Sequence, residues 1–227
     1  MIAKAASAAF LMIVMSETGK FITLEGIDFS GKSTQAGFLV RWLSDSGHDV
    51  RFIREPGGTE ASERIRAILL SREDINVCDR TELLLFLAAR AQLVDEIIIP
   101  ALKSGTIVVC DRFYDSTFAY QGFARGIDIE TIQAVNNFAT QDLSPDLTLL
   151  YDLPVDVAQR RGLDTAADHD RLEKEDIEFH KRVREGYLKL ADDYKDRIVV
   201  LNADDFQEAV WEETRRTVEF LLKGKRD

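Results

Sequence analysis

The sequence predicts an α/β protein whose parallel five-stranded sheet is flanked by helices in three layers. Short β-branched apolar runs alternate with helical patterns along the 227-residue chain, which is typical of βαβ units. The run 106–110 is apolar throughout, as expected of a strand covered on both faces. A glycine-rich turn also joins the first predicted strand, which ends at Glu25, to a helix.

The elements follow in order along the chain. Strands are predicted near 20–25, 50–54, 106–111, 147–152 and 197–201. Helices are predicted over 32–46, 59–71, 79–103, 113–121, 128–141, 154–161, 175–194 and 205–222. Pro145 and Pro154 bound the fourth strand, because proline is disfavoured inside a central strand. No repeat or Gly/Ser linker interrupts the pattern, so residues 19–227 are expected to form a single domain.

Residues 1–18 are predicted to be an N-terminal extension without a function. The run MIAKAASAAFLMIVM superficially resembles a secretory signal, and a targeting segment stays open as the alternative. Against it, a strand begins within a few residues, and Met15 starts a plausible shorter chain. No stretch is long and apolar enough to cross a membrane.

Charge and cysteine content limit the partners and the compartment. A formal net charge of -11 argues against binding a nucleic-acid backbone, which requires basic patches. Cys78 and Cys110 lack metal-ligand spacing and are too few for a disulfide framework. They are predicted to be small buried hydrophobes in a reducing cytoplasm.

The run 26–33 has the form G-x-x-x-x-G-K-S and predicts a loop that holds the phosphates of ATP. Lys32 would carry a cation to the β- and γ-phosphates, and the Ser33 hydroxyl would bind Mg²⁺. A helix that starts at the loop adds its own partial positive charge. The alternative is a glycine turn that matches by chance. The ATP-binding residues are predicted to be Gly26, Ile27, Asp28, Phe29, Ser30, Gly31, Lys32, Ser33 and Thr34.

Charged residues at two other strand ends are expected to complete the site. Asp111 closes the third strand and is predicted to be the second Mg²⁺ partner, although it would also suit a helix N-cap. Arg112 follows it and can clamp a second phosphate. Arg54 ends the second strand before a Pro-Gly-Gly turn and is expected at the same rim, since ligands bind at the carboxyl ends of parallel strands.

Two further features have an ordinary and a functional interpretation. Phe86 and Arg90 are four residues apart on one helix face, which suits a nucleobase, although periodicity alone favours core packing for Phe86. The polar, aperiodic segment from Arg160 to Arg171 is either a surface loop or a lid that closes over phosphates. Its arginines favour a lid, placed at about 160–174.

Together these motifs resemble those of bacterial thymidylate kinases. The resemblance rests on FITLEGIDFSGKSTQ, FIREPGGT, LLLFLAARAQ, VVCDRFYDSTFAYQG and DRLEKED, in order from about Phe21 to Arg182. It implies a P-loop NTPase fold and transfer of the ATP γ-phosphoryl group to thymidine 5′-monophosphate (dTMP) with Mg²⁺. It also implies a homodimer.

The resemblance also assigns roles to individual residues. Catalytic roles would fall to Lys32, Asp28, Arg112 and Arg161. The acceptor nucleotide would contact Arg54, Phe86, Arg90, Arg112, Ser116, Tyr120 and Gln121, and the metal would contact Ser33 and Asp111. In this assignment Phe86 stacks on thymine, Arg90 reads its polar edge, and Tyr120 crowds the position of a ribose 2′-hydroxyl.

One position departs from part of the family. Some members carry an arginine in the phosphate loop where this chain has Phe29, and others supply lid arginines instead. This chain is therefore expected to use its lid, which offers Arg160, Arg161 and Arg171, and Arg161 is the residue we favour.

Two other functions remain open from the sequence. A deoxynucleoside kinase would use a general base such as Glu55 or Asp111, but its neutral acceptor gives the two acceptor-side arginines no purpose. A nucleotide-dependent switch ATPase would use the same loop to order a partner-binding surface. No D-x-x-G follows Asp111 and no N-K-x-D motif is present, which disfavours a GTPase switch.

Overall fold

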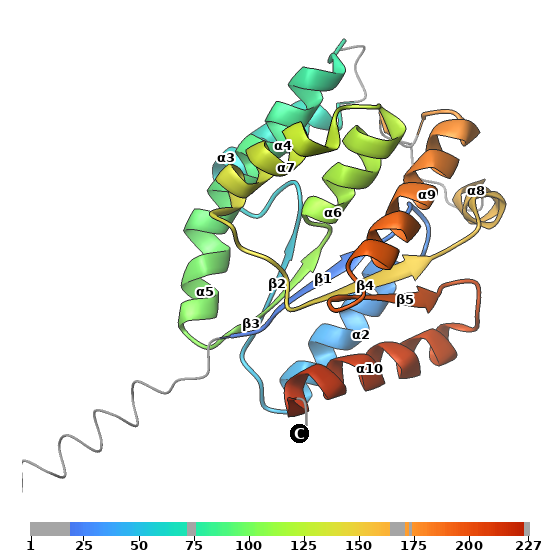
Figure 1. Cartoon of the computed structure of the whole chain (residues 1–227). Helices are drawn as coiled ribbons and strands as arrows, with labels where there is room; N and C mark the ends of the chain where they lie inside the picture. Colours follow the sequence, from blue (N-terminus) through green and yellow to red (C-terminus); the bar gives the residue numbers. More distant parts are fainter. Residues whose placement is uncertain (1–18, 72–75, 164–170, 173, 225–227) are drawn as a thin grey trace, which may run out of the picture.

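A computed structural model describes residues 19–71, 76–163, 171–172 and 174–224. Its sheet has five parallel strands in the order β2-β3-β1-β4-β5, which confirms the predicted α/β fold class (Figure 1). The strands are β1 (Phe21–Glu25), β2 (Val50–Arg54), β3 (Ile107–Asp111), β4 (Leu147–Asp152) and β5 (Ile198–Asn202). The extension 1–18 and residues 164–170 and 173 of the predicted lid lie outside the described residues. Cys110 is buried as predicted, whereas Cys78 is exposed, so its predicted burial is wrong.

Helices cover both faces of the sheet and make the three layers (Figure 1). Helices α2 (Lys32–Asp45) and α10 (Gln207–Lys223) pack together on one face. The other described helical segments are α3 (Glu60–Leu69), α4 (Asp79–Leu93), η1 (Val94–Ile98), α5 (Ile99–Lys103), α6 (Tyr114–Thr117), η2 (Phe118–Ala124), α7 (Ile129–Thr140), α8 (Val155–Leu163) and α9 (Ile177–Asp193). None of the helices in these ranges is long and apolar enough to cross a membrane.

Two predicted helices contain a π-helical segment that the sequence pattern does not reveal. The segment predicted as one helix over 79–103 consists of α4, the π-helical η1 and α5. Pro100 follows η1 and has no backbone N–H to donate, so the hydrogen-bond ladder shifts there. The helix predicted over 113–121 is the short α6, continued by π-helical η2 to Ala124. A 3.6-residue period cannot distinguish such turns from regular helix.

Strand β1 lies at the centre of the sheet and all five of its residues are buried. The strand register aligns Leu24 of β1 with Asp111 of β3, and Arg54 of β2 with the same Asp111. The loop after β1 therefore lies beside Asp111 and Arg54 at one edge of the sheet. Residues almost ninety positions apart meet there because parallel strands present their carboxyl ends together.

Candidate active site

The loop from Gly26 to Ser33 connects β1 to α2, as the motif predicts. Gly26 has φ 138°, and a Cβ at this residue would lie 2.5 Å from the carbonyl oxygen of Tyr151. Gly31 has φ 87° and caps the N-terminus of α2. Only glycine adopts these conformations without strain, so the two glycines fix the curl of the loop. The backbone N–H groups at the start of α2 then face the inside of the loop, where a phosphate binds.

Lys32 holds its ammonium group inside this loop. Its side chain is buried, and Nζ donates to the carbonyl oxygens of Gly26 at 3.0 Å and Ile27 at 2.8 Å. Burial, together with the nearby Arg112 charge, lowers the pKa of Lys32 to about 8. The ammonium is thus poorly hydrated and is positioned to pair with a polyanion.

Ser33 and Asp111 lie together as the metal assignment requires. The Ser33 hydroxyl donates to Asp111 Oδ2 at 3.1 Å, whereas buried Asp111 Oδ1 has no hydrogen-bond partner among the described residues. The N-cap position of α6 belongs to Phe113, so the alternative role of Asp111 as a cap is wrong. An orphaned carboxylate oxygen beside a hydroxyl suits Mg²⁺ when phosphate oxygens and water complete the shell. No group of three or more His, Cys, Asp or Glu side chains among the described residues could hold a metal without them.

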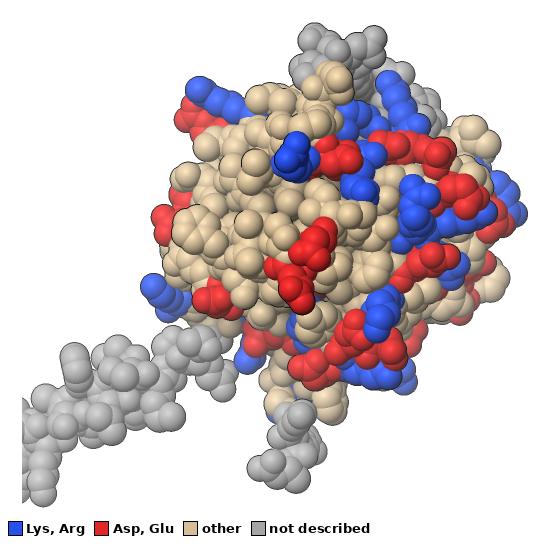
Figure 2. Space-filling model, turned by 45° about the horizontal axis from the view of Figure 1, so that its top comes forward, with Lys and Arg blue, Asp and Glu red and all other residues tan. Residues whose placement is uncertain are grey.

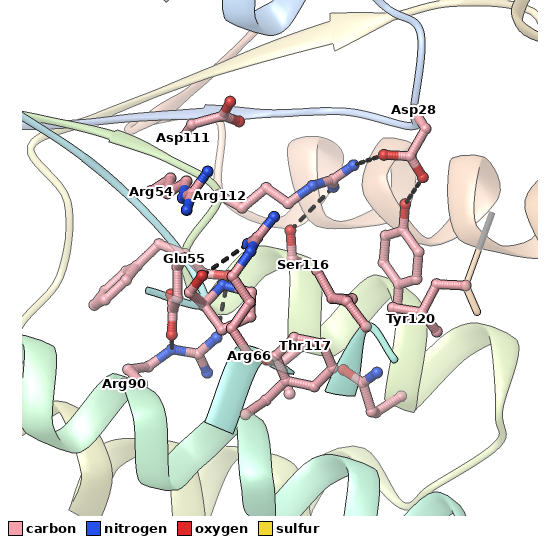
Figure 3. A pocket seen from close by; sticks show the side chains of 16 residues that line it. Asp28, Arg54, Glu55, Arg66, Arg90, Asp111, Arg112, Ser116, Thr117 and Tyr120 are labelled. Atoms are coloured by element: carbon pink, nitrogen blue, oxygen red, sulfur yellow. Dashed lines mark hydrogen bonds and ion pairs between the residues drawn. The ribbon is translucent and has the colours of Figure 1, made fainter. Parts of the chain in front are cut away.

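Arg112 borders both the phosphate loop and the neighbouring cavity. Its Nη1 donates to the Gly26 carbonyl oxygen at 2.9 Å, and its Nη2 pairs with Asp28 Oδ1 at 2.5 Å (Figure 3). Although burial alone would raise it, the charges of Arg112 and Lys32 hold the pKa of Asp28 below its usual range. Asp28 Oδ2 also accepts a hydrogen bond from the Tyr120 hydroxyl at 3.2 Å. An ionised Asp28 therefore fixes the guanidinium between the two sites.

A cavity next to the phosphate loop collects every residue that the resemblance assigned to the acceptor nucleotide (Figure 3). Its lining includes Arg54, Phe86, Arg90, Arg112, Ser116, Tyr120 and Gln121, together with Asp28 and Asp111. These residues come from the loop after β1, from β2, α4, α6 and η2, and from the end of β3 and the residue that follows it. Phe86 is only partly buried and forms part of the cavity wall, so core packing alone does not account for it. Arginines of β2, α3 and α4 and the arginine that follows β3 line a space that also has an aromatic wall.

Arg90 is held more tightly than the sequence suggests. The side chains of Arg90 and Glu55 are 1% and 2% exposed, and Arg90 Nε lies 2.6 Å from Glu55 Oε1. Arg90 Nη1 also donates to Asn136 Oδ1 at 2.9 Å. Removing either partner of such a buried pair leaves an uncompensated charge, so the pair fixes the position of the guanidinium in the cavity wall.

Sequence reasoning missed several polar residues of this site. Glu25, fully buried at the end of β1, accepts from the Phe113 backbone N–H at 2.7 Å and from the hydroxyls of Ser116 at 2.6 Å and Tyr187 at 2.9 Å. Burial and the neighbouring Asp115 charge raise the pKa of Glu25 to about 7. Arg66 and Thr117 also line the cavity. The available signal was an acidic residue at the end of a mainly apolar strand, and it pointed to Glu25.

Comparisons with known proteins agree with this geometry. The family model described as thymidylate kinase matches residues 24–214. A thymidylate kinase of Caldanaerobacter subterraneus subsp. tengcongensis is 46% identical over 91% of this chain and 98% of its own length. One of Kosmotoga olearia is 48% identical over 89% of this chain and 95% of its own.

The chain belongs to the thymidylate kinase family. A solved structure agrees: a thymidylate kinase from Ehrlichia chaffeensis superposes with a TM-score of 0.72 at 35% identity. The superposition covers 88% of this chain and 98% of that one. The family and fold inferred from the motifs are thereby confirmed, while the roles of individual residues stay predictions.

Arg161 is the lid arginine that the sequence favours, and it does not line the acceptor cavity. Its Nη2 donates to the Ala203 carbonyl oxygen at 3.1 Å and lies 3.8 Å from Asp204 Oδ1. It lines a pocket with Ser30, Gly31, Thr34, Gln35, Ala203 and the start of α10. To act on a transferring phosphoryl group, Arg161 has to exchange these contacts for contacts with the nucleotide.

Arg160 and Arg171 are held differently from Arg161. Arg160 is 70% exposed and pairs with Asp156 on its own helix. Arg171 lies 2.6 Å from the buried carboxylate of Glu82 and donates to the Leu69 carbonyl oxygen. Glu82 also accepts from Gln121, so Arg171 joins a network behind the acceptor cavity.

Proposed function

We propose that the chain transfers the γ-phosphoryl group of ATP to dTMP and produces dTDP for dTTP synthesis, the activity classified as EC 2.7.4.9. One observation carries the proposal: the Arg112 guanidinium contacts the phosphate-binding loop through Gly26 and also lines a second, arginine-rich cavity. A single cation between two anion-binding sites suits an enzyme that brings two nucleotides together. A hydrolase or switch has no use for the second site.

The residues act by positioning and by neutralising charge. The acceptor phosphate has a second pKa of about 6 and is largely a dianion near pH 7, so it needs no strong general base. Lys32 neutralises the donor phosphates, while Arg54 and Arg112 hold the acceptor phosphate in line with them. Phe86 offers a face for thymine, and the Arg90 guanidinium is the polar group beside it. Tyr120 fills the space beside the sugar, which favours a deoxyribose.

We assign Mg²⁺ to Ser33 and Asp111, whose side chains fit it as described above. When bound, the ion neutralises and orients the β- and γ-phosphates of ATP. Besides Asp111, the carboxylate of Asp28 lies beside the phosphate-binding loop. It pairs with Arg112 and holds this arginine between the ATP site and the acceptor cavity.

A coupled assay of nucleotide-dependent ADP formation over a panel of nucleoside monophosphates tests the function. We expect turnover with ATP and Mg²⁺ to be highest with dTMP and to be lost in excess EDTA. Thymidine is the decisive control, since a deoxynucleoside kinase prefers it to its monophosphate. Phosphorylation of thymidine but not of dTMP, or ADP formation independent of any acceptor, would contradict the proposal.

The contacts of Glu55 disfavour the deoxynucleoside kinase alternative. Glu55 is 4% exposed and is engaged by the Arg90 guanidinium at 2.6 Å. A general base must accept a proton from the substrate hydroxyl, and a carboxylate committed to an arginine does this poorly. Asp111 is the other base considered, and it lies against Ser33 on the donor side.

We further infer a homodimer that forms through the face of α4 and α7. Figure 2 shows charged side chains gathered on the side of α8 and α9, whereas a broad uncharged area covers the α4–α7 side. Leu84 of α4 and Phe138 of α7 are 61% and 88% exposed. Exposed apolar side chains that lie within a broad uncharged patch mark an interaction surface.

Sedimentation velocity tests the dimer. Phe138→Glu is expected to shift the protein to a monomer, because it buries a charge in the interface. Phe220→Glu changes a side chain that is 67% exposed on α10, on the other face of the sheet, and should leave the assembly unchanged. A wild-type monomer at micromolar concentration would contradict the inference.

We also infer that residues 19–227 form one kinase domain in the cytoplasm, where ATP and dTMP occur.

A further inference from the structure

Phe29 occupies the middle of the phosphate-binding loop in a conformation that is unusual for its residue type. Its φ is 62°, in the left-handed region that non-glycine residues rarely adopt. An aromatic side chain here supplies no charge to a phosphate. Such strain persists only where surrounding contacts determine it, so the contacts of Phe29 indicate its purpose.

The Phe29 ring packs against a helix that carries a predicted catalytic arginine. A Cβ placed on Gly162 of α8 would lie 2.9 Å from Phe29 Cε2 and 3.2 Å from its Cδ2 and Cζ. Only a residue without a Cβ therefore lets the ring approach so closely. Gly162 is buried, together with Val155 and Ala158 of the same helix. The ring and these side chains line a cavity of about 350 Å³ beneath α8.

The same residue also contacts Arg161 through its backbone. Arg161 Nη1 donates to the Phe29 carbonyl oxygen at 3.5 Å, while Nη2 donates to Ala203. Phe29 thus touches two consecutive residues of α8, one with its ring and one with its carbonyl group. Among the described residues, the charged partner of Arg161 is Asp204, which is 48% exposed and lies 3.8 Å away.

We propose that Phe29 is a positioning residue: its ring, seated in the gap left by Gly162, docks helix α8 on the phosphate-binding loop and so places Arg161. The proposal rests on the proposed function, because the position of Arg161 matters only for phosphoryl transfer at this loop. It explains how a loop with phenylalanine at this position serves the reaction. The loop supplies a docking surface, and the cation comes from the docked helix.

A double-mutant cycle of Phe29→Ala and Gly162→Ala tests the proposal. Gly162→Ala forces the ring to move, and we expect kcat to fall about tenfold or more, since small displacements of catalytic groups cost up to about 10²-fold. In the Phe29→Ala background the added methyl group has room, so the same change should cost less than about twofold. The KM for dTMP should stay within about twofold, because Gly162 does not line the acceptor cavity.

Two further variants serve as controls. Gly37→Ala places a Cβ on an exposed helical glycine with no atom within 4 Å, and it should leave turnover unchanged. Phe29→Leu keeps an apolar side chain and should retain more activity than Phe29→Ala. Equal losses from Gly162→Ala in both backgrounds, or no loss in either, would overturn the proposal.

Thermal unfolding of the wild type, the two single variants of the cycle and the double variant separates this proposal from the proposed function. Gly162→Ala should lower Tm by roughly 2–4 °C in the wild-type background, as expected of an overpacked contact. In the Phe29→Ala background the decrease should be less than about 1 °C. This coupling can be measured even if the wild-type protein made no dTDP, which would refute the proposed function alone. A Tm unchanged by Gly162→Ala would refute the contact itself.

Discussion

The acceptor side and the donor side of the candidate site are held by contacts of very different strength. On the acceptor side, the Arg90–Glu55 pair is 1–2% exposed and its atoms lie 2.6 Å apart. On the donor side, the Arg161–Asp204 pair is 38% and 48% exposed, with 3.8 Å between its atoms. Buried charges cannot be rearranged without a large loss, whereas exposed pairs are worth little. The acceptor wall at Arg90 is therefore preformed, whereas Arg161 on the donor side is free to rearrange when ATP binds.

Arg161→Ala is the strongest test of this contrast. If Arg161 leaves its weak partners to stabilise the transferring phosphoryl group, the substitution should lower kcat by about 10³-fold or more. This value is the lower end of the range for arginines with this role. The free energy of unfolding should hardly change. Steady-state kinetics with saturating dTMP measure the effect.

Arg160→Ala removes a neighbouring arginine that is 70% exposed, and it serves as the matched control with near-normal turnover. Near-normal turnover of Arg161→Ala itself would remove the catalytic assignment.

The opposite behaviour is expected of Arg90→Ala on the acceptor side. It leaves the Glu55 carboxylate buried without its partner, so the free energy of unfolding should fall by about 3–5 kcal/mol. Urea denaturation measures the change. Arg64→Ala breaks an ion pair whose side chains are 79% and 81% exposed, and it should cost less than about 1 kcal/mol. Equal effects of the two substitutions would show that the acceptor wall is not preformed.

Glu25 adds a pH dependence to the acceptor side. The pKa of its carboxyl group rises from 4.5 to about 7 on folding because the group is buried. Between these values the folded state binds more protons than the unfolded state, so stability should fall as the pH rises from about 4.5 to 7. The full change corresponds to about 3 kcal/mol and is complete above pH 7.

Urea titrations from pH 4.5 to 8 measure the Glu25 effect. Glu25→Gln should abolish this part of the slope. Glu208→Gln, at an exposed position of α10, should keep it. Burial also raises the pKa of Glu55 to about 7, so a smaller slope should remain in Glu25→Gln. A slope as steep as that of the wild type would assign the whole effect to another group.

The smallest effect is expected at the hydrogen bond from Tyr120 to Asp28, which links the acceptor cavity to the phosphate-binding loop. Tyr120→Phe removes the hydroxyl that donates to Asp28, and a hydrogen bond to a charged group is worth about 1.5–3 kcal/mol. We expect kcat/KM for dTMP to fall about tenfold. Tyr114→Phe removes a hydroxyl that bonds Ser144 outside the cavity, and it should have no effect on activity. A Tyr120→Phe enzyme with unchanged kcat/KM would show that Asp28 needs no support from Tyr120.

Most of the site was visible in the sequence because its residues follow strands. The phosphate loop follows β1, Arg54 is the last residue of β2, and Asp111 is the last residue of β3. Parallel strands bring their carboxyl ends together at one edge of the sheet. Residues within helices were harder to place. Arg66 and Thr117 line the cavity, yet each lies in a pattern indistinguishable from ordinary helix surface or core. Helix periodicity gives a face and does not say what that face meets.

The sequence by itself determined the fold class, the phosphate-binding loop and the family, because these depend on local spacing and on glycines at positions of positive φ. Only the tertiary structure decided the partners of the buried charges, which are Glu55 for Arg90 and Ser116 and Tyr187 for Glu25. It also decided the packing of the Phe29 ring against Gly162. Those contacts join segments far apart in the chain. Their energies depend on burial and on distances of a few ångströms, which no local pattern encodes.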